Sequence, residues 1–100
     1  MAKFQLTKRA VIDLKNVWNY TFDHWSEKQA DRYFNDLIEH CSKIANNPKI
    51  GKQYESILIG LRGSKINKHI IFFRQQTKDE IEVVRVLHER MDLKSRLLDE

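Results

Sequence analysis

The chain has 100 residues, of which 41% are hydrophobic and 32% are charged. This length holds one hydrophobic core and leaves no room for a second domain, and the composition is too apolar for a disordered chain. The longest apolar run, Ile70–Phe73, is far shorter than the ~20 residues that a membrane span needs. The first residues, Met1–Leu6, lack the apolar core of a signal peptide. Together with a single cysteine, Cys41, which excludes an intramolecular disulfide, these features predict one cytoplasmic domain over residues 1–100.

Basic residues are concentrated in the middle of the chain. Eighteen Lys and Arg residues against fourteen Asp and Glu residues give a net charge of +4 at pH 7. Seven of the basic residues lie between Lys49 and Lys78, where Glu55 is the only acid. This concentration favours an anionic partner, either a nucleic acid or an acidic protein.

The first quarter of the chain predicts a strand followed by a helix. Phe4 and Leu6 alternate with polar residues, which is the period of a half-buried strand. Thr7 suits a helix N-cap, because its hydroxyl can accept a bond from a free backbone N–H. After Thr7, apolar residues recur at spacings of three and four, as on one face of an amphipathic helix. They are Val11, Leu14, Trp18, Phe22 and Trp25.

A second helix is predicted after Ser26, which with Gln29 forms the pattern of a capping box. Asn46, Asn47 and Pro48 end this helix. The short junction between the two helices predicts an antiparallel helical hairpin. The apolar stripe of the second helix consists of Ala30, Phe34, Leu37, Cys41 and Ile44.

The second half of the chain predicts three strands, at Ser56–Arg62, His69–Gln76 and Ile81–His88, joined by short polar connections at 63–68 and 77–80. Their nearly continuous apolar runs indicate strands that are covered on both faces. The helical hairpin can cover one face, and the other needs the tail, Met91–Leu98, or a partner. The predicted fold is α+β with the order β-α-α-β-β-β, a helical hairpin on a small, mainly antiparallel sheet, and a short C-terminal helical tail.

Several local motifs follow this order along nearly the whole chain. They are Ala10–Leu14 with Trp18–Tyr20, Ala30–Tyr33, Asn47–Gly51, Gly60–Arg62, Ile70–Arg74 and Glu82–Asp92. In this order and spacing they resemble the ParE branch of the RelE/ParE toxin superfamily. The resemblance implies a type II toxin that inhibits DNA gyrase, blocks replication and serves plasmid stabilisation. It also implies a ParD-like antitoxin that binds through an acidic amphipathic segment, in a hetero-oligomer with the toxin.

RelE-type relatives suggest an alternative, ribosome-dependent cleavage of messenger RNA. Such cleavage needs a general base, a general acid and cations near the phosphate. The RelE branch has a tyrosine late in the chain, whereas no tyrosine follows Tyr54 here, and Gly60 stands where that branch favours a lysine. Lys68, His69 and His88 could substitute. We therefore favour a gyrase inhibitor, assign no catalytic residue and keep the ribonuclease as the alternative.

The candidate residues for contact with the target combine the family pattern with the basic half of the chain. They are Arg62, Arg74, Arg85, His88 and Arg90. Arg85 lies within an apolar strand, so it fits equally well an internal role, in which it pairs with Glu82 or Asp92 or extends its charged end to the surface.

The sequence predicts no metal site and no cofactor. The histidines and Cys41 show no pair at ligand spacing. The segment Gly60–Gly63 lacks the Lys-Ser/Thr pair that follows the glycines of a phosphate-binding loop. Trp18 and Trp25 lie on the apolar stripe of the first helix, which favours core packing over base stacking.

Overall fold

Two long helices, a five-stranded sheet and a short final helix make up residues 2–98, which the computed structural model describes. The predicted α+β class, the helical hairpin and the helical tail are therefore confirmed. The elements in chain order are β1 (Lys3–Leu6), α1 (Lys8–His24), α2 (Glu27–Asn46), β2 (Lys52–Gln53), β3 (Arg62–Ile66), β4 (His69–Thr77), β5 (Glu80–His88) and α3 (Leu93–Leu98).

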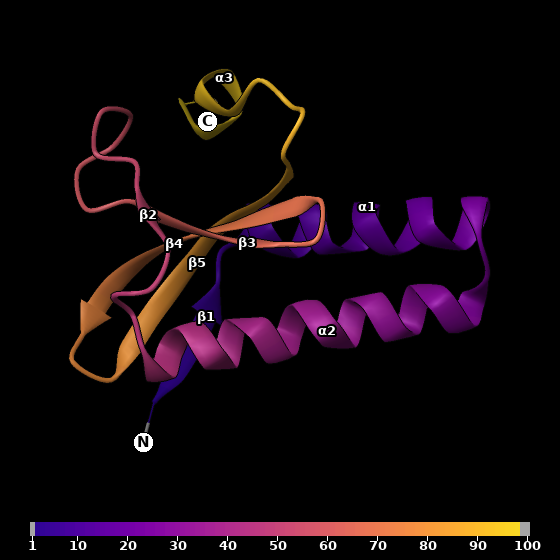
Figure 1. Ribbon diagram of the computed structural model, residues 1–100, viewed down its shortest axis with the longest axis horizontal. Helices are drawn as coiled ribbons and strands as arrows, with labels where there is room; N and C mark the ends of the chain where they lie inside the picture. Colours follow the sequence, from indigo (N-terminus) through magenta and orange to yellow (C-terminus); the bar gives the residue numbers. More distant parts are fainter. Residues whose placement is uncertain (1, 99–100) are drawn as a thin grey trace.

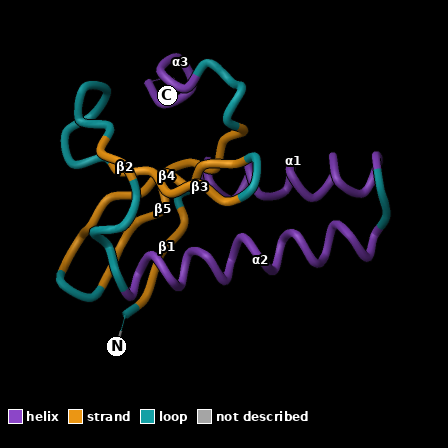
Figure 2. Tube along the Cα trace, viewed as in Figure 1, coloured by secondary structure: helices purple, strands orange, loops and turns teal. Residues whose placement is uncertain are grey.

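The strands are arranged in the order β1-β5-β4-β3-β2. β1 runs parallel to β5, and the other neighbouring strands are antiparallel. The helical hairpin lies against one side of the sheet and α3 lies on the other side (Figure 1). The end of the hairpin where α1 turns into α2 extends well past the sheet, as the tube view also shows (Figure 2). None of the helices in residues 2–98 is long and apolar enough to cross a membrane.

Both predicted helix caps are confirmed. The Thr7 hydroxyl oxygen accepts the Ala10 N–H at 3.1 Å, and that of Ser26 accepts the Gln29 N–H at 3.1 Å. Thr7 also donates its hydroxyl proton to the Val84 carbonyl at 2.7 Å. The start of α1 is thereby fixed to β5, the strand beside β1.

The main core lies between the helical hairpin and the sheet. Most of the stripe predicted for α2 is buried there, while Phe34 is half-buried. The sheet supplies Ile71 and Phe73 from β4, and Ile81 and Val83 from β5. The residues of the helices that are buried in this core are Ala10, Leu14, Leu37, Cys41, Ile44 and Ala45.

Of the apolar stripe predicted for α1, Leu14 is buried in the main core, but the other members are not. Val11 and Phe22 are exposed, and Trp25 is 75% exposed, so the prediction of core packing is wrong for Trp25. Trp18 is half-buried, stacks on Phe22 at 5.2 Å between ring centroids and donates its Nε1–H to Asp31 of α2. For Phe22 and Trp25 the reason is that the hairpin extends past the sheet, so that among the described elements the distal part of α1 lies beside α2 and not against a strand (Figure 1).

A second core covers the opposite face of the sheet. Its buried members include Phe72 and Leu87 of the sheet and Leu97 of α3, and Leu93 packs against them. The segment 54–61 contributes Leu61, with Tyr54, Ile57 and Leu58 packed around it. Of the two alternatives predicted for this face, the tail or a partner, the structure shows the tail, which covers the face together with the loop 54–61.

The strand predicted at Ser56–Arg62 is wrong. Residues 55–60 form turns, and the Leu61 N–H bonds the Leu58 carbonyl within the segment. Gly60 has φ of +77°, a conformation that strands do not use. The segment is rich in apolar residues because it is a loop that packs on a sheet face. The strand in this part of the chain is β3, which begins at Arg62. The connection predicted at 63–68 shrinks accordingly to the turn at Asn67 and Lys68, and the additional short strand β2 was not predicted.

Candidate interaction groove

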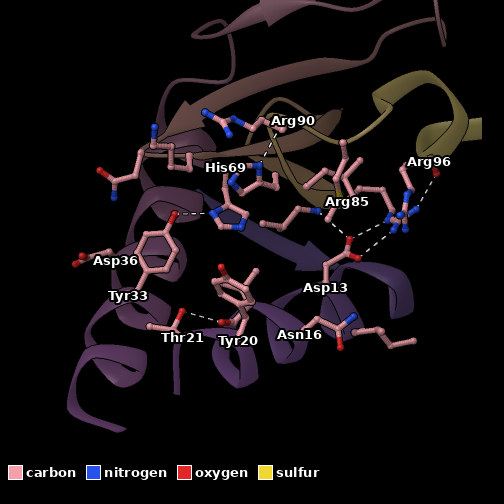
Figure 3. Close-up of a pocket in the computed structure, with 18 of the residues that line it drawn as sticks. Asp13, Asn16, Tyr20, Thr21, Tyr33, Asp36, His69, Arg85, Arg90 and Arg96 are labelled. Atoms are coloured by element: carbon pink, nitrogen blue, oxygen red, sulfur yellow. Dashed lines mark hydrogen bonds and ion pairs between the residues drawn. The ribbon is translucent and has the colours of Figure 1, made fainter. Parts of the chain in front are cut away.

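A groove with a volume of about 1220 Å³ lies between the helical hairpin and the neighbouring ends of β4 and β5 (Figure 3). Its walls come from α1, α2, the β3–β4 turn, the end of β5 and the segment that leads into α3. The groove exists because β1 pairs only with Glu80–Val83 of β5. Beyond that point no described strand borders this side of β5, and the side faces α1 across the groove.

Exposed apolar side chains line the groove, most of them from α1 and the residue that follows it. Trp25 and Tyr20 are 75% and 62% exposed, and Ile12 and Met91 are also exposed. Large apolar side chains that gather in a concave surface commonly mark a site for a protein partner. The sequence prediction had placed Trp25 in the core, whereas the structure places it in the lining of the groove.

The groove carries a net positive charge. Asp13 is neutralised by Arg85, and Asp36 is the remaining acid among the described lining residues. The other basic lining residues are Arg9, Arg32, Lys68, Arg90 and Arg96. A partner segment that combines carboxylates with apolar side chains would fit this lining.

A cluster of polar rings forms one end of the groove. Tyr33 Oη lies 2.7 Å from His69 Nδ1, and the rings of His69 and His88 meet edge to face with centroids 5.3 Å apart. The Arg90 N–H donates to His88 Nδ1 at 3.1 Å.

Burial lowers the pKa of His69 to about 4, with a further contribution from His88. Burial also raises the pKa of Tyr33. Near neutral pH, His69 is therefore a neutral imidazole beside a neutral phenol.

Arg85 and Asp13 form a buried ion pair at the other end of the groove (Figure 3). Arg85 Nε and Nη2 donate to the two carboxylate oxygens of Asp13 at 2.8 and 3.0 Å. Asp13 also accepts the Val86 N–H at 3.0 Å. The carboxylate partner predicted for Arg85, Glu82 or Asp92, is thus replaced by Asp13 of α1.

Sequence reasoning missed Asp13 because it lies 72 positions before Arg85. A signal was present, however. Asp13 falls on the same side of α1 as Ala10, Leu14 and Val17, so it is a carboxylate on the sheet-facing side of an amphipathic helix. Buried carboxylates require a partner, and a basic residue in an apolar strand is a natural one.

The structure brings some of the sequence-predicted target residues together and separates others. His88, Arg90 and Arg85 line the groove. Arg62 lies at the start of β3, where it donates to the Lys49 carbonyl at 3.2 Å, and Arg74 lies on β4 opposite Glu82. Neither belongs to the groove lining.

The buried Nε atom of Arg74 has no hydrogen-bond partner among the described residues. For metal binding, residues 2–98 contain no group of three or more His, Cys, Asp or Glu side chains arranged to hold an ion.

Comparison with known proteins identifies the family of the chain. Residues 4–93 match the family described as "ParE toxin of type II toxin-antitoxin system, parDE". Toxin ParE1 of Mycobacterium tuberculosis H37Rv is 34% identical over 96 residues, which cover 96% of this chain and 98% of the relative. Toxin ParE1 of Caulobacter vibrioides is 31% identical over 97 residues, which cover 97% and 99% of the two chains. Toxin ParE of Escherichia coli is 31% identical over 99 residues, which cover 99% and 96%.

A solved structure shares the fold. The chromosomal ParDE toxin-antitoxin system from P. aeruginosa contains a chain that superimposes with a TM-score of 0.75 at 20% identity, covering 88% of this chain and 96% of that chain. The match of the family to most of the chain, the full-length relatives and the shared fold agree with the resemblance of the sequence motifs. The chain belongs to the ParE family of toxins, which are the toxin components of parDE type II toxin-antitoxin systems.

Proposed function

We propose that this toxin acts in the cytoplasm by inhibiting DNA gyrase, and that an antitoxin neutralises it by placing an acidic amphipathic segment in the groove. Membership of a type II toxin-antitoxin family makes an antitoxin the partner of this chain. Our proposal concerns three further points: the chemical character of the antitoxin segment, the site at which it binds and the cellular target.

One observation favours inhibition over RNA cleavage, namely the burial of His69 against Tyr33 in the ring cluster. Metal-free cleavage needs one group that takes a proton and another that gives one near neutral pH. Burial lowers the pKa of His69 to about 4, so at neutral pH its ring is an uncharged imidazole and a weak base. The raised pKa of Tyr33 likewise keeps its phenol neutral. Binding to a target protein requires neither group to titrate.

The lining of the groove supports a helical antitoxin segment over an added strand. Two backbone groups at the open side of β5 are already occupied, because Thr7 donates to the Val84 carbonyl and Asp13 accepts the Val86 N–H. A strand that approached this side would have to displace both side chains. A helix can instead bury its apolar face against Tyr20 and Trp25, as in other helix-in-groove complexes.

The basic residues of the groove provide the charge complementarity. Lys68 and Arg90 lie on the sheet side and Arg32 lies on α2, so carboxylates of the antitoxin segment would meet cations on both sides. We propose that His88 and Arg90 also contact the target, as does the C-terminal segment, with Arg62 and Arg74 as further contacts outside the groove. An antitoxin seated in the groove would then cover part of the target-binding surface, which accounts for neutralisation.

The experiment that tests this function measures supercoiling by purified gyrase with the purified toxin, beside a ribosome-programmed cleavage assay. We expect the toxin to inhibit supercoiling, the antitoxin encoded beside it to relieve the inhibition, and the message to stay intact. Arg90→Ala should weaken inhibition by about tenfold, as expected when a contact residue at an interface is truncated. Lys78→Ala is the matched control, because Lys78 is an exposed cation in the β4–β5 turn outside the groove.

A second candidate function, ribosome-dependent RNA cleavage, is favoured by the grouping of Tyr33, His69 and His88 with two cations, Lys68 and Arg90, in one groove. Cleaved message with unimpaired supercoiling would assign this function instead. In that case His88→Ala should abolish cleavage while leaving the fold intact, because His88 lies half-exposed at the end of β5.

A further inference from the structure

A single buried guanidinium, that of Arg85, joins three elements of the fold. Arg85 lies on β5, Asp13 lies on α1, and the carbonyl of Arg96 lies on α3. In addition to its two bonds to Asp13, Arg85 donates from Nη1 to the Arg96 carbonyl at 2.7 Å (Figure 3). Arg85 and Asp13 are only 9% and 8% exposed, so the two bonds between them are shielded from water, and the bond to Arg96 is partly buried.

A β-bulge directs Arg85 toward both helices. The register between β4 and β5 shifts beside Phe72, so that Phe72 pairs with Arg85 while Phe73 pairs with Val83. As a result Val83 and Val86 both pack against the helical hairpin, and Val84 packs on the opposite face. Bulges commonly redirect a side chain in this way. Here the redirected side chain can reach α1 and α3 at the same time.

The pattern of bonds requires a guanidinium. Nε and Nη2 form a bidentate pair with the carboxylate, while Nη1 points to a carbonyl on a different helix. Arginine offers several N–H donors in one rigid plane, whereas a lysine ammonium is a compact charge with no fixed fork. Asp13 sets the rotation of the guanidinium plane, and the carbonyl of α3 lies where the remaining N–H points.

The position of α3 depends on few other contacts. The helix has six residues, which is too short to be stable alone. Leu97 is its one buried residue among those described, and Leu93 is half-buried. Asp92 caps the start of the helix by accepting bonds from Ser95 within the same segment, so the cap does not attach α3 to the sheet. The bond from Arg85 is therefore a directional attachment of α3 to the rest of the fold.

We infer that Arg85, oriented by Asp13, is the positioning residue of the C-terminal helix and sets how this segment is presented to the target of the toxin. The part that concerns the target rests on the proposed gyrase inhibition through the C-terminal segment. The attachment of α3 by Arg85 does not depend on which target the toxin has. In this assignment Arg85 acts on the target through α3 and does not touch it.

The test compares the wild-type toxin with Arg85→Lys, which keeps a positive charge beside Asp13 but cannot also bond the Arg96 carbonyl. Amide hydrogen exchange in residues 93–98 should accelerate by at least about tenfold, in line with the loss of a hydrogen bond from a charged group. Gyrase inhibition should weaken by a similar factor. Affinity for the antitoxin should stay within about threefold, because the aromatic wall and the other cations of the groove are unchanged.

Two further variants keep the test decisive. Arg96→Ala retains the backbone carbonyl and should leave exchange in residues 93–98 unchanged, which separates the carbonyl from the side chain. If Arg85→Lys fails to fold, Asp13→Asn keeps the shape of the partner and weakens the orientation of Arg85, so exchange in α3 should accelerate by a smaller factor.

The outcomes separate this inference from the proposed function. Unchanged exchange in α3 of a folded Arg85→Lys protein overturns the inference, as does accelerated exchange with undiminished gyrase inhibition. If the wild-type toxin does not inhibit gyrase, the proposed function fails, whereas the exchange experiment still decides whether Arg85 positions α3.

Discussion

Tyr33 Oη and His69 Nδ1 lie 2.7 Å apart at one end of the groove, although the two residues are 36 positions apart in the sequence. Tyr33 comes from α2 and His69 begins β4, so this contact connects the helical hairpin to the sheet beside the β3–β4 turn. His88 packs its ring edge to face against His69 from the neighbouring strand. Burial of His69 in this cluster makes part of the stability of the protein depend on pH.

The stability of the toxin should fall as the pH is lowered from about 6.5 to about 4. The pKa of His69 is lowered from 6.5 to about 4 in the folded state, so in this window the unfolded chain binds the proton more readily. His69 contributes its stability fully above pH 6.5 and loses it as the pH falls. We expect a loss of about 2 kcal/mol from this group, after allowance for the partial exposure of its ring. Urea unfolding at several pH values measures it.

His69→Gln is the control for this pH dependence, because glutamine does not titrate. The variant should show a shallower fall in the free energy of unfolding over the same window. The remaining slope includes His40, whose pKa is also lowered, chiefly by burial. Equal slopes for the variant and the wild-type protein would contradict the assignment to His69.

Removal of Asp13 should destabilise the fold strongly. Asp13→Ala would leave the buried guanidinium of Arg85 without its counter-ion, and the loss of one partner of a buried pair costs about 3–5 kcal/mol. The double variant Asp13→Leu with Arg85→Met, which replaces the pair by apolar side chains, should recover part of this loss. Denaturant unfolding of the two variants gives the comparison, and a double variant less stable than Asp13→Ala would argue against a dominant charge-burial penalty.

Truncation of Leu37 should lower the stability of the protein much more than truncation of Trp25. Leu37 is fully buried under the sheet, so Leu37→Ala should cost about 2–5 kcal/mol in the free energy of unfolding. Trp25→Ala should change stability by less than about 1 kcal/mol, because most of the ring is already in water. It should nevertheless weaken antitoxin binding by at least about tenfold, as loss of an aromatic anchor does.

Calorimetric titration with the antitoxin measures that loss of affinity. Phe22→Ala is the matched control, because Phe22 is an exposed aromatic residue three positions before Trp25 and outside the groove lining. An antitoxin that binds the Trp25→Ala protein as tightly as the wild-type protein would place its segment elsewhere.

Gly63 should be intolerant of a side chain. A Cβ atom at this position would lie 2.8 Å from the Tyr54 ring, 2.9 Å from Ile70 Cγ2 and 3.1 Å from the Phe72 ring. Gly63→Ala should therefore cost about 1–3 kcal/mol through overpacking of the second core. Gly60→Asn is the control, since Gly60 has open space around it and asparagine tolerates positive φ. Similar melting temperatures for Gly63→Ala and the wild-type protein would show that the second core can adjust.

Local patterns predicted those elements whose sequence repeats with a regular period. The two helices and the strands β4 and β5 were recognised because their apolar residues recur at helical spacing or form long runs. The segment 54–61 was misread because Ile57, Leu58 and Leu61 cover a sheet face from a loop, and the identity of an apolar residue does not distinguish that role from a strand.

The groove could not be predicted in the same way. Its residues come from separate parts of the chain, and it opens only because β1 is shorter than β5 and the helical hairpin extends past the sheet. The pairing of Asp13 with Arg85 likewise depends on how α1 lies across the end of β5. The sequence analysis named Arg85, His88 and Arg90 as candidates for target contact, and the structure places all three in the lining of the groove, while their role at a target stays a prediction.

The most direct test of gyrase inhibition is a supercoiling assay with purified gyrase and purified toxin, with and without the antitoxin, run beside ribosomes programmed with a defined message. We predict that supercoiling fails when the toxin is added, that it recovers when the antitoxin is added in equal amount, and that the message stays intact. Unimpaired supercoiling together with a cleaved message would contradict the account and would make Tyr33, His69 and His88 the first residues to test as catalytic groups.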